Sequence, residues 1–315
     1  MLRSLLTLCL AALGLFDCAG PAHLASMPAG EATVRPPTPV AEAAPDPSVE
    51  PRTRAAFAGI MEAARAGRVA ALSYGEIVQW TGERLLGQPY VAGLLDAPPE
   101  EMLVVNLRAF DCVLYVENVL ALAETIARET YAWDDYVAAL EAMRYRDGRM
   151  QGYCSRLHYF SDWIADNAAR GRVENVTEAS GGVRFPKTLS FMSANRSAYP
   201  RLASDETFAC IVAREADLRG LELFYIPQER IALAYPHLRP GDVIATTTGL
   251  GGLDVTHTGF VYRPPGGRGT GFMHASQTQR EVVVSEDLAR YVQGVRAQTG
   301  IIVARPLDPR TRRDR

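Results

Sequence analysis

Apolar residues recur at helical spacing in several parts of the chain, and this pattern predicts its helices. In residues 113–127, for example, Val113, Val116 and Leu120 would share one helical face. By the same reasoning, helices are predicted at residues 53–67, 73–86, 113–127, 134–143, 204–219 and 285–295. Gly87 and Pro89 end the second of them.

The pattern changes after Pro240 to short β-rich runs separated by Gly and Pro turns. Strands are predicted at residues 242–247, 254–262, 271–276, 281–284 and 300–305. Helices in the first part and strands in the last part predict an α+β fold, with helix 113–127 packed on an antiparallel sheet.

Length and composition indicate one globular domain. The chain has 315 residues, of which 48% are hydrophobic and 22% charged, enough for a large core. We assign residues 53–309 to a single domain. Within it, residues 145–236 form a long mixed segment, which we interpret as an insertion or subdomain that shapes a groove.

Both ends of the chain differ from this body. Residues 1–25 carry an apolar run after Arg3 and are interpreted as an export signal, which predicts a location in the periplasm or cell envelope. The protein would contact the membrane only if this leader were retained or if Cys18 were lipidated. Residues 26–52 are rich in Pro and Ala and are expected to be an extended linker, and the basic residues 310–315 a solvated tail.

The net charge is −3, so the chain has no basic footprint for nucleic acid. Removal of the leader would leave Cys112, Cys154 and Cys210, an odd number in a compartment that favours disulfides. A Cys154–Cys210 disulfide is one possible pairing, and it would reserve Cys112 for chemistry.

Cys112 lies where the helical pattern of residues 113–127 begins. The first turn of a helix has unpaired N–H groups and the positive end of the helix dipole, which together lower the pKa of a thiol from its ordinary value of about 8.5. Cys112 is therefore a candidate nucleophile. The alternative is a small buried hydrophobic residue, because many cysteines have that role.

A thiolate nucleophile needs a base and a group that orients the base. His23 falls in the leader or linker and His237 in a proline-flanked turn, which leaves His158, His257 and His274.

His257 and His274 are nearly symmetric about the turn at residues 264–267. In a simple hairpin they would face each other directly, with Cβ atoms about 5 Å apart. We assign His257 as general base and His274 as the group that orients it, as in the cysteine–histidine–polar arrangement of papain-like hydrolases. A bulge or a wider loop would shift the register.

A zinc site formed by His257, His274 and Asp254 is the competing chemistry. No H-E-x-x-H or paired C-x-x-C pattern supports it, and it would give Cys112 no role. We therefore expect no metal and no cofactor.

Several segments resemble the NlpC-like bacterial cell-wall cysteine hydrolases. They are LGQPYVAG at 86–93, FDC at 110–112, PGDVI at 240–244, DVTHTGF at 254–260 and MHAS at 273–276. A closer resemblance is to the N-acetylmuramoyl-L-alanine amidase-like branch. It is carried by NLRAFDCV at 106–113, ENVLAL at 117–122, RYRDG at 144–148 and SRLHYFSDW at 155–163.

This resemblance extends over roughly residues 70–306 and implies a papain-like fold. Cys112 would be the nucleophile, His257 the base and His274 the third polar group, with Tyr90 at the border of the site. The chain departs from the wider superfamily after the cysteine, where Val113 follows in place of the usual Ser-Gly pair.

The resemblance also implies a reaction on peptidoglycan or small muropeptides. The amide between the lactyl group of N-acetylmuramic acid and L-alanine would be cleaved through a thioester on Cys112. The alternatives are a γ-D-glutamyl-diaminopimelate endopeptidase and a non-catalytic wall-binding module.

Two further residues are candidates for substrate binding. Arg156 could hold a carboxylate of the stem peptide, or instead form a structural ion pair with Asp162 or another acid. His158, with Tyr159 and Trp163, could line a sugar site or belong to the core.

Overall fold

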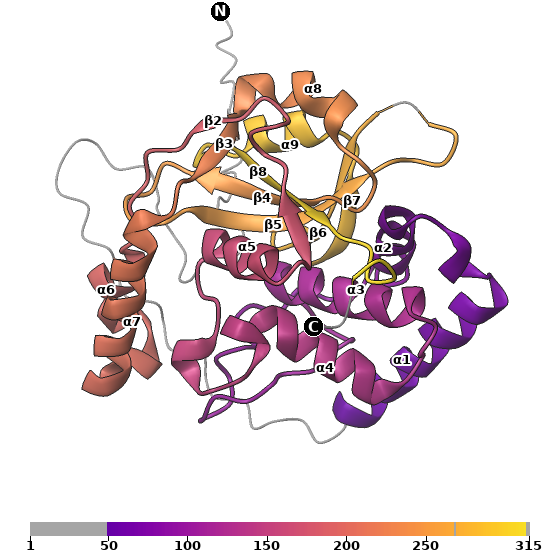
Figure 1. Ribbon diagram of the computed structural model, residues 1–315, viewed down its shortest axis with the longest axis horizontal. Helices are drawn as coiled ribbons and strands as arrows, with labels where there is room; N and C mark the ends of the chain where they lie inside the picture. Colours follow the sequence, from indigo (N-terminus) through magenta and orange to yellow (C-terminus); the bar gives the residue numbers. More distant parts are fainter. Residues whose placement is uncertain (1–48, 268, 313–315) are drawn as a thin grey trace, which may run out of the picture.

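The computed structural model describes residues 49–267 and 269–312, and their elements form three layers with a sheet between two sets of helices (Figure 1). The α-helices are α1 (Val49–Ala66), α2 (Tyr74–Glu83), α3 (Cys112–Ala127), α4 (Trp133–Arg144), α5 (Phe160–Ala169), α6 (Phe191–Ala194), α7 (Asp205–Asp217), α8 (Ile231–Ala234) and α9 (Leu288–Gly294). The strands are β1 (Val173–Asn175), β2 (Val183–Arg184), β3 (Phe224–Pro227), β4 (Val243–Thr248), β5 (Val255–Tyr262), β6 (Gly271–Ser276), β7 (Glu281–Ser285) and β8 (Gln298–Pro306).

All eight strands belong to one antiparallel sheet, in the order β2-β3-β8-β4-β5-β6-β7, with β1 also paired to β8. The last strand, β8, therefore meets β1 and β3 from the middle of the chain as well as β4. The segment at residues 145–236 is joined to the main sheet through these strands.

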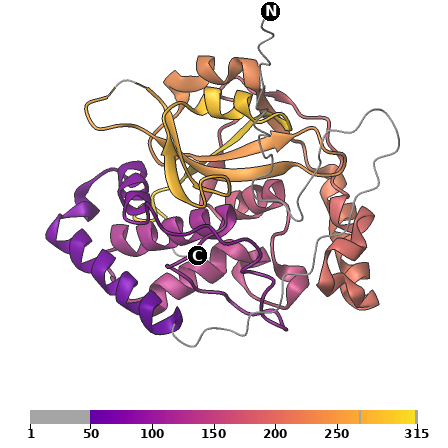
Figure 2. The same cartoon turned by 180° about the vertical axis from the view of Figure 1, so that it is seen from behind.

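Helix α3 lies at the centre of the lower layer and is buried along its length, with only Val113 outside the buried set. Its side chains, with those of α2, α4 and α5, pack against the sheet face that carries Phe260 and Met273. Helices α8 and α9 cover the other face, where Val261 and Phe272 lie (Figures 1 and 2). The continuous apolar character of α3 is typical of a helix buried on all sides.

A third cluster of apolar side chains lies within the mixed segment. It contains Tyr159, Met192, Leu202 and Ile211 and packs around α6 and α7, which stand to one side of the sheet in both views. A disulfide between Cys154 and Cys210 ties the start of this segment to α7 across 56 residues. This is the pairing that the cysteine count had left open.

The predicted mixed α+β fold with an antiparallel sheet is confirmed, and the predicted helices and later strands each correspond to an observed element within a few residues. The sequence patterns missed the helices α5, α6 and α8 and the short strands β1 to β3. Strands of two to four residues are too short to show a period of two.

Two features concern the ends of the described chain. Helix α1 begins at Val49, inside the range expected for the linker, so the predicted end of the linker at residue 52 needs correction. In the predicted tail, Arg310 is exposed, and its Nη1 donates to the carbonyl of Ala70 at 2.6 Å. Arg312 is ion-paired with Glu124. The predicted export signal and Cys18 lie outside the described residues.

Candidate active site

Cys112 is the first residue of α3 and is 1% exposed. The preceding residue, Asp111, caps the helix because its Oδ1 accepts a hydrogen bond of 2.8 Å from the backbone N–H of Leu114. The predicted position of the cysteine in the first helical turn is therefore confirmed. The amide groups and dipole at this end of α3 stabilise negative charge on a sulfur atom there.

Asp111 also brings a titratable carboxyl next to the sulfur. Burial raises the pKa of Asp111 to about 6, although the N–H of Leu114 opposes the shift, and the charge of Glu117 raises it further. An ionised carboxylate disfavours a neighbouring thiolate, because like charges repel.

Cys112 is held at the edge of the sheet by a short ladder. Pro89 forms a bridge with Glu281 of β7, and Tyr90 forms a parallel bridge with Phe110. The N–H of Tyr90 donates to the carbonyl of Arg280 at 2.8 Å, and Phe110 lies two residues before the cysteine. This ladder places the half-buried Tyr90 beside the start of α3, as the resemblance implied for a residue that borders the site.

The two histidines predicted to meet are in contact. Nε2 of His257 lies 2.7 Å from Nδ1 of His274, and both residues are buried. Their predicted direct opposition across the hairpin is wrong. Phe260 pairs with Met273 and Tyr262 with Gly271, so the loop is centred one residue later than expected and the histidines are diagonal neighbours.

The imidazoles lie in an aromatic setting on the α9 face of the sheet. Phe272 stacks on His274 with ring centroids 4.6 Å apart, and Tyr291 of α9 lies 4.7 Å from the same ring. Burial lowers the pKa of His257 to about 3, so this imidazole is neutral at pH 7. On its other side, His274 Nε2 lies 3.1 Å from Ser285 Oγ.

Cys112 and His257 belong to the same end of the sheet but reach it from different layers. Ser276 pairs with Glu281, which bridges to Pro89. If the pairing of β5 with β6 continues in the same register, His257 lies opposite Ser276. His257 then belongs to the row of paired residues that runs through Pro89 toward Cys112. Helix α3 covers the opposite face of the sheet. Strand β5 contains a bulge next to His257, and bulges re-aim side chains.

Arg156 is engaged inside the protein. Its guanidinium is ion-paired with Asp96, donates to the carbonyl of Leu95 at 2.9 Å and lies 3.8 Å from Glu101. These contacts match the structural alternative, with acids other than Asp162, which instead pairs with Arg146. They hold the segment between Tyr90 and Cys112.

His158 and Arg156 nevertheless line a common shallow recess, together with Arg146 and Arg214. Each of these three guanidinium groups has an acidic partner, because Arg146 pairs with Asp162, Arg156 with Asp96 and Arg214 with Asp217. Burial and the charge of Arg156 lower the pKa of His158 to about 3.

The recess is tied to the histidine strand. The N–H of Ser161 at the start of α5 donates to Asp254 Oδ2 at 2.7 Å, and Asp254 precedes β5. Trp163, considered for a sugar site, is instead 1% exposed and stacks on Phe160 in the core.

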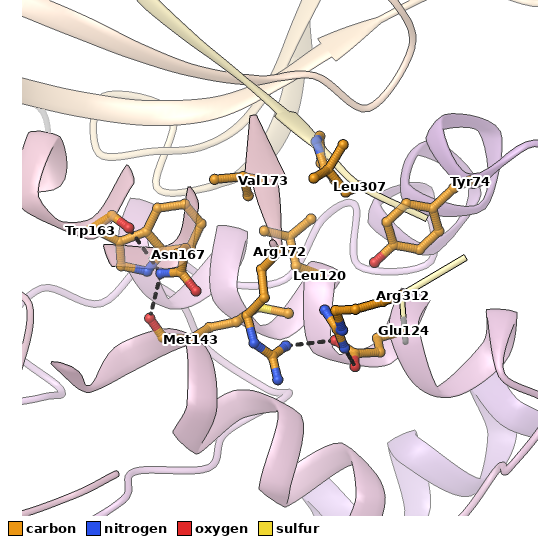
Figure 3. Close-up of a pocket in the computed structure, with 11 residues that line it drawn as sticks. Tyr74, Leu120, Glu124, Met143, Trp163, Asn167, Arg172, Val173, Leu307 and Arg312 are labelled. Atoms are coloured by element: carbon orange, nitrogen blue, oxygen red, sulfur yellow. Dashed lines mark hydrogen bonds and ion pairs between the residues drawn. The ribbon is translucent and has the colours of Figure 1, made fainter. Parts of the chain in front are cut away.

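A second recess, of about 250 Å³, lies on the far side of α3 (Figure 3). Arg172 Nη1 donates to Glu124 Oε2 at 2.7 Å there, and Arg312 of the tail pairs with the same carboxylate. The carboxylate is thus neutralised by arginines from two parts of the chain. Of the residues considered for the site, Trp163 lines this recess.

The zinc alternative has no support in the arrangement of its ligands. Asp254 accepts backbone hydrogen bonds from Ser161 and Val255. Among residues 49–267 and 269–312, no three His, Cys, Asp or Glu side chains are grouped to hold a metal ion.

Sequence reasoning missed two sets of contacts around the site. Ser285 carries no motif, and only the pairing of β6 with β7 reveals it. Glu117 and Arg144 were quoted for the resemblance without a role, yet they form a buried ion pair between α3 and α4. Its signal was the charged Glu117 within the mostly apolar pattern of the predicted helix.

Comparisons with known proteins identify the family of this chain. The model of the AmiA-like family, described as N-acetylmuramoyl-L-alanine amidase-like, matches residues 80–301, and the chain belongs to this family. No match is found among the curated proteins.

Solved structures that resemble this chain agree with this family assignment. The crystal structure of an N-acetylmuramoyl-L-alanine amidase from Bacteroides uniformis at 1.07 Å resolution shares 35% identity, with a TM-score of 0.70, over 74% of this chain and 99% of the amidase. Its structure at 1.15 Å resolution gives 35% identity and a TM-score of 0.68, over 74% and 98%. A Legionella pneumophila protein shares the fold at 19% identity, with a TM-score of 0.62, over 82% of this chain and 96% of its own.

The family is amidase-like, which implies a hydrolase that acts on peptidoglycan. As for the membrane, the described part of the chain contains no helix with the length and apolar character needed to span a bilayer.

Proposed function

We propose that this protein is a cysteine-dependent amidase that cleaves the bond between the lactyl group of N-acetylmuramic acid and L-alanine. The observation that carries the proposal is the 2.7 Å contact between His257 and His274, together with the position of Cys112 at the capped start of α3. Membership of an amidase-like family supplies the type of bond.

The first half of the reaction is acylation. The thiol of Cys112 gives its proton to Nδ1 of His257, and the sulfur attacks the lactyl carbonyl carbon. The resulting oxyanion is stabilised by the backbone N–H of Cys112 and by the hydroxyl of Tyr90. When the C–N bond breaks, the amine of L-alanine takes the proton from His257 and leaves.

The second half is hydrolysis of the thioester. Water gives a proton to His257 and attacks the same carbonyl carbon, and the C–S bond breaks. The muramoyl carboxylate is released, and the sulfur of Cys112 recovers its proton. His274 holds the ring of His257 in place through both halves.

The recess at Arg156 and His158 is proposed as the subsite for the stem peptide. Its guanidinium groups attract a carboxylate, and Met192 and Ile211 on its wall suit aliphatic groups. We further propose that the protein acts in the periplasm or cell envelope, because an export signal is predicted in residues 1–25 and the substrate class is found there.

Product analysis on a defined disaccharide–peptide muropeptide tests the proposal, in the presence of dithiothreitol to keep thiols reduced. We expect mass spectrometry to show a free peptide with L-alanine at its amino terminus and a peptide-free disaccharide. Cys112→Ala should abolish both products, and EDTA should leave them unchanged.

The control variant is His237→Asn, which removes an exposed histidine from a turn and should retain full activity. A cut after D-glutamate would instead identify an endopeptidase. Binding without turnover by the wild-type protein would identify a wall-binding module.

A further inference from the structure

His274 lies between two hydrogen-bonding partners. Its Nδ1 is 2.7 Å from His257 Nε2, and its Nε2 is 3.1 Å from Ser285 Oγ. Ser285 is the last residue of β7 and pairs with Phe272 of β6. Three side chains on three adjacent strands, β5 to β7, are thus linked in one hydrogen-bonded row.

The position of the protons along this row decides whether His257 can act as a base. A neutral imidazole donates through one nitrogen and accepts through the other. If His257 is to accept a proton at Nδ1, its own proton must be on Nε2, pointing at His274. His274 must then accept at Nδ1 and donate from Nε2.

We propose that Ser285 is a positioning residue that fixes this arrangement. Its Oγ accepts the Nε2–H of His274, which keeps His274 Nδ1 as an acceptor and His257 Nδ1 ready for the thiol proton. Loss of that acceptor removes the hydrogen bond that stabilises the Nε2–H form of His274 and so favours the form with the proton on Nδ1. His257 would then receive a hydrogen bond at Nε2 and carry its own proton on Nδ1, where it cannot act as a base.

The packing around the row supports a fixed ring. His274 is fully buried. The ring of Phe272 stacks on it with 14° between the ring planes, and the ring of Tyr291 also packs against it. A ring held in this way responds to a lost hydrogen bond by a shift of its proton from one nitrogen to the other rather than by rotation. The inference rests on the proposed function, because the required direction of the hydrogen bonds along the row follows from the transfer of the Cys112 thiol proton to His257.

Ser285→Ala and Ser285→Thr test the proposal. We expect Ser285→Ala to lower kcat about five- to tenfold with KM unchanged, since one neutral hydrogen bond is lost. Ser285→Thr keeps the hydroxyl and should retain near wild-type kcat. The matched control is Val284→Thr, the preceding residue of the same strand, whose side chain packs against the core on the α3 side.

Nitrogen-15 NMR of the imidazoles gives a readout that does not depend on turnover. The wild-type protein should show His274 protonated at Nε2, and Ser285→Ala should show a gain of the Nδ1–H form. An Nδ1–H form in the wild type, or full kcat in Ser285→Ala, would overturn the role of Ser285. Turnover by Cys112→Ala would instead reject the proposed function, so the two failures can be told apart.

Discussion

Arg144 of α4 binds Glu117 of α3, with 2.6 Å between Nε and Oε2 and both side chains 1% exposed. The same guanidinium donates from Nη1 to the carbonyl of Val104 at 2.7 Å, in the segment that leads to Cys112. One buried pair thus connects the nucleophile helix, its neighbour and the chain that enters the site.

Removal of one partner should be strongly destabilising, because it leaves an uncompensated buried charge. We expect Glu117→Ala to lower the free energy of unfolding by about 3–5 kcal/mol, measured by urea denaturation. Glu222→Ala is the matched contrast, since Glu222 and Arg184 form a pair that is 63% and 70% exposed. That exposed pair should contribute less than about 1 kcal/mol, and equal effects in the two variants would contradict the assignment.

The two catalytic histidines should differ in their contributions. We expect His257→Ala to lower kcat by about 10²–10⁴-fold, because it removes the general base. His274→Asn should have a smaller effect, since an amide at this position can still accept the Nε2–H of His257. Single-turnover kinetics would measure both, and a larger loss for His274→Asn would reverse the assigned roles.

Asp111 should control the ionisation of Cys112. Asp111→Asn keeps an oxygen that can cap α3 but removes the negative charge beside the sulfur. We therefore expect a lower thiol pKa, so that alkylation of Cys112 by iodoacetamide reaches half its maximal rate at a lower pH. An unchanged alkylation profile would show that the carboxylate does not act on the thiol.

His158 should make the protein less stable in acid. Its folded pKa, about 3, is below the unfolded value, so the unfolded state binds the extra proton and stability falls as the pH drops from 6.5 toward 3. The slope from this residue is at most about 1.4 kcal/mol per pH unit. His158→Gln should reduce the slope of the free energy of unfolding against pH over that window, and an unchanged slope would contradict the buried neutral histidine.

The sequence predicted features that depend on local periodicity and spacing. The spacing of apolar residues predicted helix α3, and the character of residues 110–112 predicted that the cysteine lies at its start. The contact between His257 and His274 followed from their symmetry about one turn. Only the register was wrong. The last pair of residues before the hairpin loop is Tyr262 and Gly271, and the turn signals in the sequence do not identify this pair.

Features that depend on tertiary contacts could not be predicted in this way. Ser285 and His274 lie 11 residues apart on neighbouring strands. Arg156 was a candidate either for a substrate carboxylate or for a structural ion pair, and the fold supplies Asp96 and Glu101 as its acidic partners from within the protein. A single sequence shows which groups can pair, whereas the fold decides which of them meet.

Acid quenching during turnover of a disaccharide–peptide muropeptide tests the central claim most directly. The account predicts a thioester-linked muramoyl group, found by mass spectrometry on the proteolytic fragment that contains Cys112 and absent from Cys112→Ser. An acyl group ending in γ-D-glutamate on that fragment, or rapid turnover with no adduct on Cys112, would contradict it.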